Sequence, residues 1–459
     1  MYGVVNDFMQ LHWLPFLGVA TFTLIVILEY KSTLGIFSPS GLASLYSLIK
    51  FFMESLLVIN YASLVSLADI YGVSEQEHIS QAILISFLVS SVSYGILWIC
   101  SYPIRSSYSH DIAYKFRQRM RVNQTLIKDG WTISKTSFGY LILFNFGLIF
   151  LLIVFQSAGG ISNYVSSFSS RTEMLAGYGA LVKFCTLFIQ LATLYFFANR
   201  YKLSPKFSYF IVLFGMLTLF SLGGRTAPIF LLFTCLIYVH FYHQKFSISL
   251  KLLVFISVLF VGALFISLLR FGNYESIIEM ELSEIPFSIW FSVIGAYFSY
   301  IIRDSVIISY FSENDFWYGA GLVSFLLAFF PRGIYPEKPV VDNGVYVIAM
   351  SDGQRVTPPM VPADLPHYGW PESYMSGYME AGWIGLLLGV FLSCYLVYFI
   401  FLRLVKSDFK IEWVFLYSFF IFRQPLYLTS IDLFNIVFHT IFVLGVGFVI
   451  RTKFVYKKS

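Results

Sequence analysis

Apolar runs of about 18–25 residues recur along the whole chain, and they constrain its fold more than any other feature. A run of that length, wound as a helix, crosses the roughly 30 Å hydrocarbon core of a bilayer. Lipid offers no water to the backbone, so each run must satisfy its own N–H and C=O groups as a helix. A mean hydropathy of +0.75, with 51 Phe and 32 Tyr among 459 residues, excludes a soluble globule of this size. The sequence therefore predicts an all-α polytopic membrane protein.

We expect about eleven transmembrane helices, with a range of eleven to thirteen. The eleven spans lie near 12–29, 46–69, 80–101, 137–156, 177–198, 208–224, 226–243, 252–269, 378–402, 411–424 and 430–450. They divide the chain into an N-terminal bundle of eight helices (1–269), a long loop (270–377) and a C-terminal bundle of three helices (378–459). Two short apolar runs in the loop, 287–302 and 319–330, are expected as re-entrant helices, interfacial helices or an extra hairpin.

The distribution of Lys and Arg predicts which side of the membrane each loop faces, because cytoplasmic loops carry an excess of both. Segment 102–136 holds seven of these residues, whereas none precedes His12. On the same side as 102–136 lie the other basic segments, 200–206, 244–251, 403–410 and 451–459. We therefore expect the N-terminus and the long loop 270–377 outside, and the C-terminus in the cytoplasm.

The basic residues left on the outer side are nearly all arginines. Seven of the eight are Arg: Arg171, Arg225, Arg270, Arg303, Arg332, Arg355 and Arg423, with Lys338 as the exception. A guanidinium group is permanently charged and binds phosphate oxygens in a bidentate fork, whereas Lys would serve equally well as a simple lipid anchor. The preference for Arg indicates recognition of a phosphate-bearing ligand on this face.

Several kinds of chemistry are disfavoured because their motifs are missing. No glycine-rich loop followed by Lys-Ser/Thr occurs, which argues against an ATP-driven pump. The longest cytoplasmic segment, about 35 residues, is too short for an ordinary nucleotide-sugar domain. No Asp-x-Asp pair or His/Asp/Glu cluster indicates a metal, and the net charge of +5 reflects topology and does not suggest nucleic acid. An enzyme of this kind would take its substrate from the membrane and use no metal or cofactor.

Three stretches on the outer side concentrate the candidate site residues: "SLGGRTAP" (221–228), "FPRGIYPEKP" (330–339) and "PHYGWPESYMSGYMEAGWIG" (366–385). Prolines restrict the backbone of the second stretch, which lowers the entropy lost on binding. The candidate catalytic residues are Arg225, Arg270, Arg332, His367, Glu372 and Arg423. The candidate substrate-binding residues are Lys338, Tyr335, Tyr368, Trp370 and Tyr374.

Five of these candidates also have a structural interpretation. Arg225 and Arg270 could anchor the chain to lipid head groups. Arg332 and Lys338 could be ordinary loop charges, and Glu372 could stabilise a helix start through the helix dipole.

Other charged residues are expected to pair or to pack. Arg303 and Asp304, adjacent in sequence, indicate a local ion pair, and Lys50 and Glu54, four apart in a helix, are expected to pair with each other. Glu380 is expected at or just below the membrane surface, where an ionisable group is a functional hypothesis. His439 is expected to pack inside the last span.

The number of spans, "GGRTAP" between two of them, and a long outer loop with "FPRGIYPEKP" and "WPESYMSGYMEAGWIG" resemble the Wzy-type polymerases of O-antigen or capsule repeat units. The resemblance covers most of the chain in topology but specific residues only in 221–228 and 330–385. The paired RX10G loop motifs of some members are not evident, because the residue eleven beyond Arg225 is Leu236 and the one eleven beyond Arg355 is Pro366.

The resemblance implies a GT-C-like glycosyltransferase in the bacterial inner membrane, acting on its periplasmic face. Its partners would be glycans carried on undecaprenyl pyrophosphate, the bilayer, and optionally a chain-length regulator protein. The outer arginines would stabilise the leaving pyrophosphate, His367 or Glu372 would act as the base, and Tyr and Trp side chains would stack on sugars.

Three alternatives stay open from the sequence. An O-antigen ligase shares the architecture and differs in its acceptor. A lipid-linked glycan flippase would need charges lining a cavity within many spans, and few charges lie inside the spans. A secondary transporter is disfavoured because we find no inverted internal repeat.

Overall fold

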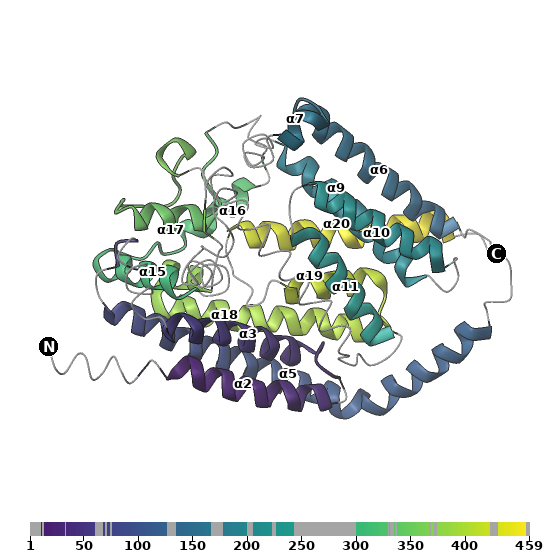
Figure 1. Ribbon diagram of the computed structural model, residues 1–459, viewed down its shortest axis with the longest axis horizontal. Helices are drawn as coiled ribbons and strands as arrows, with labels where there is room; N and C mark the ends of the chain where they lie inside the picture. The colour runs from purple at the N-terminus through teal and green to yellow at the C-terminus, as the bar shows by residue number, and fades with distance from the viewer. Residues whose placement is uncertain are drawn as a thin grey trace, which may run out of the picture.

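Figure 1 shows the computed structural model of the chain, in which helices are joined by loops. The structure describes residues 11, 13–32, 34–59, 68, 71–73, 76–125, 135–166, 178–199, 205–222, 226–242, 300–328, 330, 335, 337–366, 369–370, 374–422 and 430–455. No strand occurs in these ranges. The all-α class predicted from the sequence is confirmed for this part of the chain.

Seven helices in the described ranges are long and apolar enough to cross a membrane. They are α2 (Leu14–Lys31), α3 (Pro39–Ile59), the first part of α5 (Gln76–Thr125), α6 (Lys135–Ser157), α9 (Gly179–Ala198), α18 (Met375–Lys406) and α20 (Ser430–Val455). Three shorter apolar helices are α10 (Pro205–Ser221), α11 (Thr226–Tyr242) and α19 (Ile411–Phe422). These ten fall on ten of the expected spans, and the span expected at 252–269 lies outside the described residues. The protein is a polytopic membrane protein, and the count of eleven stays a prediction.

Helix α3 begins earlier than hydropathy predicts. The expected span starts at residue 46, whereas the helix starts at Pro39. The Ser38 hydroxyl accepts a hydrogen bond from the Gly41 backbone N–H at 3.0 Å, which is the geometry of an N-cap, and Pro39 occupies the first helical position. Capping chemistry, which a hydropathy window does not detect, therefore sets this boundary.

Two groups of helices make up the described bundle (Figure 1). In one, α2 packs on α3, and both pack on α5 together with α18. In the other, α6 and α10 pack on α9. Helix α19 joins the groups because it packs on α18 of the first and on α9 of the second, and it also packs on α11 and α20.

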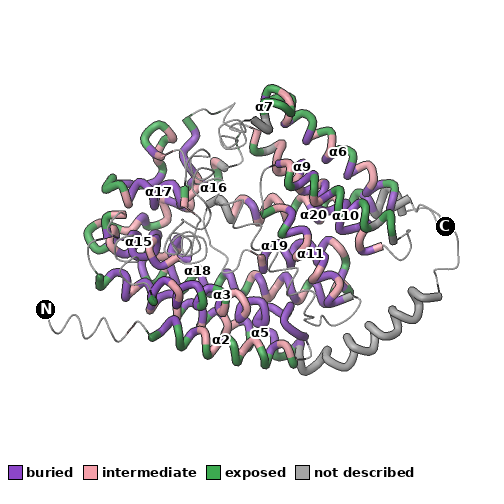
Figure 2. The backbone as a smooth tube through the Cα atoms, viewed as in Figure 1, coloured by how far each residue is buried: buried purple, intermediate pink, exposed green. Residues whose placement is uncertain are grey.

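The outward faces of several helices expose large apolar side chains, as a lipid-facing surface requires. Figure 2 shows exposed residues along α2 and α6. Leu24 of α2 is 60% exposed, Leu152 of α6 is 60% exposed and Ile384 of α18 is 71% exposed. Exposed apolar side chains gathered along helix faces in this way would drive a water-soluble protein to associate. The bilayer is therefore the environment of these faces.

The expected loop 270–377 contains helices between residues 300 and 366: α15 (Ile301–Glu313), α16 (Ala320–Ala328), α17 (Asn343–Ser351) and the short 3-10 helix η3 (Pro362–Asp364). Beyond the two short apolar runs, the loop was not expected to contain a helix, but α17 lies inside it. The Asp342 side chain caps α17 by accepting a hydrogen bond from the Gly344 N–H at 2.9 Å, and the apolar residues 345–350 are buried. We call residues 300–366 the α15–α17 unit.

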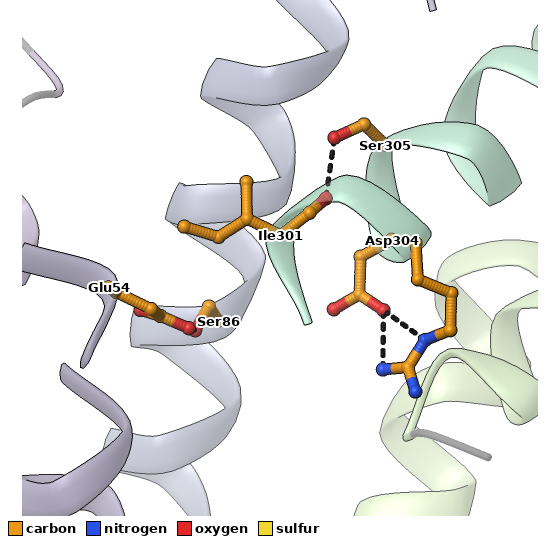
Figure 3. Close-up of polar contacts among 6 residues, drawn as sticks. Glu54, Ser86, Ile301, Asp304 and Ser305 are labelled. Atoms are coloured by element: carbon orange, nitrogen blue, oxygen red, sulfur yellow. Dashed lines mark hydrogen bonds and ion pairs between the residues drawn. The ribbon is translucent and has the colours of Figure 1, made fainter. Parts of the chain in front are cut away.

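Helix α15 runs antiparallel to α5 and reaches into the bundle. Its C-terminal residues, Tyr310 and Glu313, share a cleft with Tyr71, which precedes α5. Its N-terminal residues lie near Ser86, and Ser86 lies about 15 Å along α5 from Gln76 at 1.5 Å per residue (Figure 3). The limits of the three expected domains stay predictions, but residues from the expected loop do pack between membrane helices.

Candidate functional site

The six predicted catalytic residues lie outside the described residues: Arg225, Arg270, Arg332, His367, Glu372 and Arg423. Tyr368, a predicted substrate-binding residue, lies outside them as well. Their roles stay predictions. The structure places the other four predicted substrate-binding residues, Lys338, Tyr335, Trp370 and Tyr374.

Within the proline-rich stretch 330–339, Lys338 is buried and Tyr335 is exposed. The Lys338 ammonium group donates a hydrogen bond to the Phe330 carbonyl at 3.0 Å, and the Lys338 N–H donates to the Tyr335 carbonyl at 3.2 Å. These bonds tie Lys338 back to Phe330 and Tyr335. Lys338 therefore has a structural role in addition to the predicted ligand role, while the Tyr335 ring, 40% exposed, has a face open to solvent.

Trp370 connects α17 with residues 71–73, which precede α5. Its backbone N–H donates to the Gly344 carbonyl at 3.1 Å, and its ring meets the edge of Tyr71 with centroids 4.7 Å apart. A Cβ atom at Gly344 would collide with the Trp370 carbonyl, so glycine is needed there. Trp370 thereby fastens α17 to the segment that precedes α5.

Tyr374, at the N-cap of α18, is 5% exposed and lies inside the protein. Lys50 Nζ lies 5.5 Å from the centroid of its ring. Burial, together with the nearby Asp304 and Glu54 carboxyl groups, raises the pKa of the Tyr374 hydroxyl well above its ordinary value. The ring therefore belongs to a buried group of polar residues and not to an open sugar-stacking surface.

That group, which we call the buried polar cluster, joins side chains from three helices and from the N-cap of a fourth. Its members are Lys50 and Glu54 of α3, Ser86 and Ser90 of α5, Arg303 and Asp304 of α15, and Tyr374 beside α18. None of the four charged members is more than 6% exposed. Burying ionised groups is costly unless each finds a partner of opposite charge or a hydrogen bond. Each charged member of the cluster therefore needs a partner within the protein.

The α3 half of the cluster is bonded through α5. Lys50 Nζ donates to Ser90 Oγ at 2.6 Å and to the Ser86 carbonyl at 3.1 Å. Ser86 Oγ donates to Glu54 Oε1 at 2.8 Å. Lys50 and Glu54 were expected to pair directly, but Ser86 bridges them, because α5 offers the buried ammonium group a hydroxyl and a carbonyl close by.

The α15 half of the cluster is an ion pair between neighbours in sequence (Figure 3). Arg303 Nη2 lies 3.0 Å and Nε 3.3 Å from Asp304 Oδ1. The guanidinium also lies over the ring of Tyr300, 4.0 Å from its centroid. The local Arg303–Asp304 pair predicted from the sequence is confirmed.

The two halves act on each other electrostatically. Asp304 lies close enough to influence Lys50, Glu54 and Tyr374. With two cations and two anions the cluster is formally neutral. The sequence shows both pairs, but nothing in their spacing predicts that α15 brings them together.

Glu380 has a structural partner. Its Oε2 accepts a hydrogen bond from the Gly319 N–H at 2.9 Å, directly before α16, and the side chain is 7% exposed. A carboxylate there stabilises the positive end of the helix dipole. The carbonyls of Met379 and Glu380 accept hydrogen bonds from the N–H groups of Trp317 and Tyr318, at 3.0 and 2.7 Å.

Helix α18 is interrupted directly after Glu380. Ala381 and Gly382 leave the helical conformation, and Gly382 has φ of +60°, which favours glycine. The backbones of Gly377 and Gly385 lie so close that a Cβ on either would clash with the other's carbonyl. The break therefore gives the loop 317–319 access to backbone carbonyls that a continuous helix would use itself.

His439, expected to pack, stacks on Phe419 with ring centroids 4.0 Å apart. Among the described residues, no group of three or more His, Cys, Asp or Glu lies together as a metal site would need.

Comparison of the chain with models of protein families, with curated proteins and with solved structures finds no match.

Proposed function

We propose that the protein is a glycosyltransferase that polymerises oligosaccharide repeat units carried on undecaprenyl pyrophosphate. It would act at the periplasmic face of a bacterial inner membrane and contribute to O-antigen or a related surface polysaccharide. The proposal is supported by the polytopic helical architecture, by the arginine-rich outer face and by the motifs of segments 221–228 and 330–385.

One structural observation, the packing of the α15–α17 unit, adds support to the proposal. The α15–α17 unit is a folded body that reaches into the bundle through the buried polar cluster and is fastened again by Trp370 on Tyr71. An enzyme that joins two membrane-bound substrates needs such a rigid body beside the membrane, because reacting groups must be held in place. A transporter with simple connecting loops has no such requirement.

The proposed reaction needs three roles. The terminal hydroxyl of one lipid-linked repeat unit attacks the anomeric carbon of the growing chain, with inversion. The bond from that carbon to the pyrophosphate oxygen breaks, and the electron pair leaves with undecaprenyl pyrophosphate. His367 or Glu372 takes the hydroxyl proton. Arg225, Arg270, Arg332 and Arg423 stabilise the charge that grows on the pyrophosphate, and the loss of one costs on the order of 3 kcal/mol of barrier.

A lipid-linked glycan flippase is the second candidate, because Lys50 and Glu54 are fully buried ionisable residues within a candidate span. Such residues often mark a transport path. Their hydrogen bonds to Ser86 and Ser90 and the absence of a net charge favour a structural role in joining α3 to α5.

Deletion of the gene, followed by gel analysis of surface glycans, separates the candidates. Loss of long chains with one repeat unit retained supports the polymerase. Glycan that stays wholly on its lipid carrier indicates a ligase, and glycan trapped at the cytoplasmic face indicates a flippase.

Two variants then test the arginine roles in the deletion strain. Arg225→Lys and Arg332→Lys keep the charge but lose the bidentate fork, so neither should restore long chains although both are expressed normally. Full activity of both would refute the proposed arginine chemistry.

A further inference from the structure

A cleft of about 220 Å³ opens between three elements of the outer region. Its walls are the turn 71–73 before α5, the C-terminal half of α15 and the chain that leaves α17 at 353–355. None of the predicted site residues that the structure describes lines it. The space is smaller than the roughly 300–1,000 Å³ pockets that enclose whole drug-sized ligands, so it suits one small unit of a larger molecule.

The walls of the cleft are held in place. The Tyr310 hydroxyl accepts a hydrogen bond from the Val356 N–H at 2.9 Å and donates to the Val356 carbonyl at 3.0 Å. Asn314 Nδ2 donates to the Tyr310 carbonyl at 2.8 Å, and the Gln354 N–H donates to the Ala349 carbonyl at 2.9 Å. A ligand would therefore meet a preorganised surface, which reduces the entropy lost on binding.

Three polar side chains of the lining are available to a ligand. Glu313, Gln354 and Arg355 are exposed. Within the described part of the chain, none of the three side chains makes a hydrogen bond or an ion pair. Together they offer a carboxylate acceptor, an amide with both functions and a guanidinium donor fork. Neighbouring sugar hydroxyl groups, each donor and acceptor at once, match this combination.

Other ligand classes fit less well. A lipid tail would leave these polar groups unsatisfied. A free phosphate or pyrophosphate is repelled by the Glu313 carboxylate, which offsets the charge of Arg355. The cleft also has an aromatic wall, because Tyr71 lines it and is supported by the ring of Trp370. An aromatic ring beside a few oriented polar groups is typical of a small-molecule site.

We propose that this cleft is a subsite for one neutral sugar ring of the glycan substrate. The assignment of that ring to a lipid-linked glycan rests on the proposed function; the binding of a sugar ring does not. Its polar residues Glu313, Gln354 and Arg355 are not among the predicted catalytic residues, so the role proposed for the cleft is to position the glycan and not to break bonds.

The direct test is saturation-transfer NMR on the detergent-purified full chain with D-glucose, D-galactose, D-mannose, L-rhamnose and N-acetyl-D-glucosamine. At least one of these probes should bind. The double variant Glu313→Ala/Arg355→Ala should weaken that binding about tenfold or more, because two charge-assisted hydrogen bonds are lost. Ser309→Trp, which fills the cleft and leaves the charged groups intact, should weaken it as well. The control Asp364→Asn, at an exposed residue outside the lining, should bind like the wild type.

The outcomes for the cleft and for the proposed function are separable. If no probe binds the wild type, or if both cleft variants bind as the wild type does, the subsite is refuted. If gene deletion leaves chain length unchanged while a probe still binds in the cleft, the polymerase proposal fails and the subsite stands. If deletion abolishes long chains and the double variant polymerises with an unchanged KM for the lipid-linked acceptor, the subsite fails and the polymerase stands.

Discussion

Replacing Arg303 by Met while Asp304 stays buried is expected to lower the free energy of unfolding by about 3–5 kcal/mol, because one charge of a buried pair is left without its partner. Arg303 is 6% exposed and Asp304 0% exposed, and their nearest N–O distance is 3.0 Å. At an effective dielectric constant of about 20, two charges at that distance attract by roughly 5 kcal/mol, consistent with the expected loss. Asp304→Leu should cost a similar amount.

The double variant Arg303→Met/Asp304→Leu should be much closer to the wild type, within about 1–2 kcal/mol, because it removes both charges and leaves Lys50 and Glu54 balanced. Unfolding titrations with SDS in mixed micelles, followed by tryptophan fluorescence, measure all three variants. The control is Arg403→Met, whose exposed guanidinium overlies Phe399 at 5.1 Å and should change stability by less than about 0.5 kcal/mol. Single variants that each cost less than about 1 kcal/mol, as an exposed pair would, would refute the account of the cluster.

Three further predictions concern Glu380, Gly344 and Tyr374, which lie at contacts of the α15–α17 unit and at the start of α18. Glu380→Ala should destabilise the protein by about 1–3 kcal/mol, because it leaves the Gly319 N–H without its acceptor. Glu380→Gln keeps an acceptor and should retain most of the stability. Equal losses for the two variants in thermal unfolding would argue against the hydrogen bond from Gly319 to Glu380. Gly344→Ala should cost about 1–3 kcal/mol, because its Cβ collides with the Trp370 carbonyl, and unaltered stability would contradict that contact. Because the pKa of Tyr374 is raised in the folded protein, the unfolded chain releases the phenol proton first, so the stability from this group is present below about pH 10 and falls above it. Tyr374→Phe should therefore lose less stability than the wild type between about pH 9 and 11. Identical alkaline profiles would contradict the burial of Tyr374.

Hydropathy predicts most of the described helices because the bilayer imposes length and polarity on each span separately. The start of α3 was missed by seven residues, since Ser38 and Pro39 determine it through capping and not through hydropathy. Helix α17 was expected to be part of the loop. The prolines and glycines around it are typical of a loop, and the apolar run after Asp342 is too short to outweigh them. Capping residues such as Ser38 and Asp342 can be recognised in a sequence once a helix start is expected nearby.

Of the contacts in the buried polar cluster, only the Arg303–Asp304 pair was predicted correctly from the sequence. The sequence indicates Arg303–Asp304 from adjacency, and the structure confirms the pair, but the joining of that pair to Lys50 and Glu54 depends on how α15 packs on α5. The cleft below Tyr71 was not foreseen for the same reason: its polar residues, Glu313 and Arg355, come from segments whose approach is a tertiary property. Neither residue has a local motif that would single it out.

The most direct test of the polymerase proposal uses the purified protein in liposomes supplied only with an undecaprenyl-pyrophosphate-linked repeat unit. The proposal predicts a ladder of glycans longer than one repeat unit, with undecaprenyl pyrophosphate released once for each bond formed, and no ladder with Arg332→Lys. A protein that leaves every repeat unit unjoined, or that only moves it across the bilayer, would contradict the proposal.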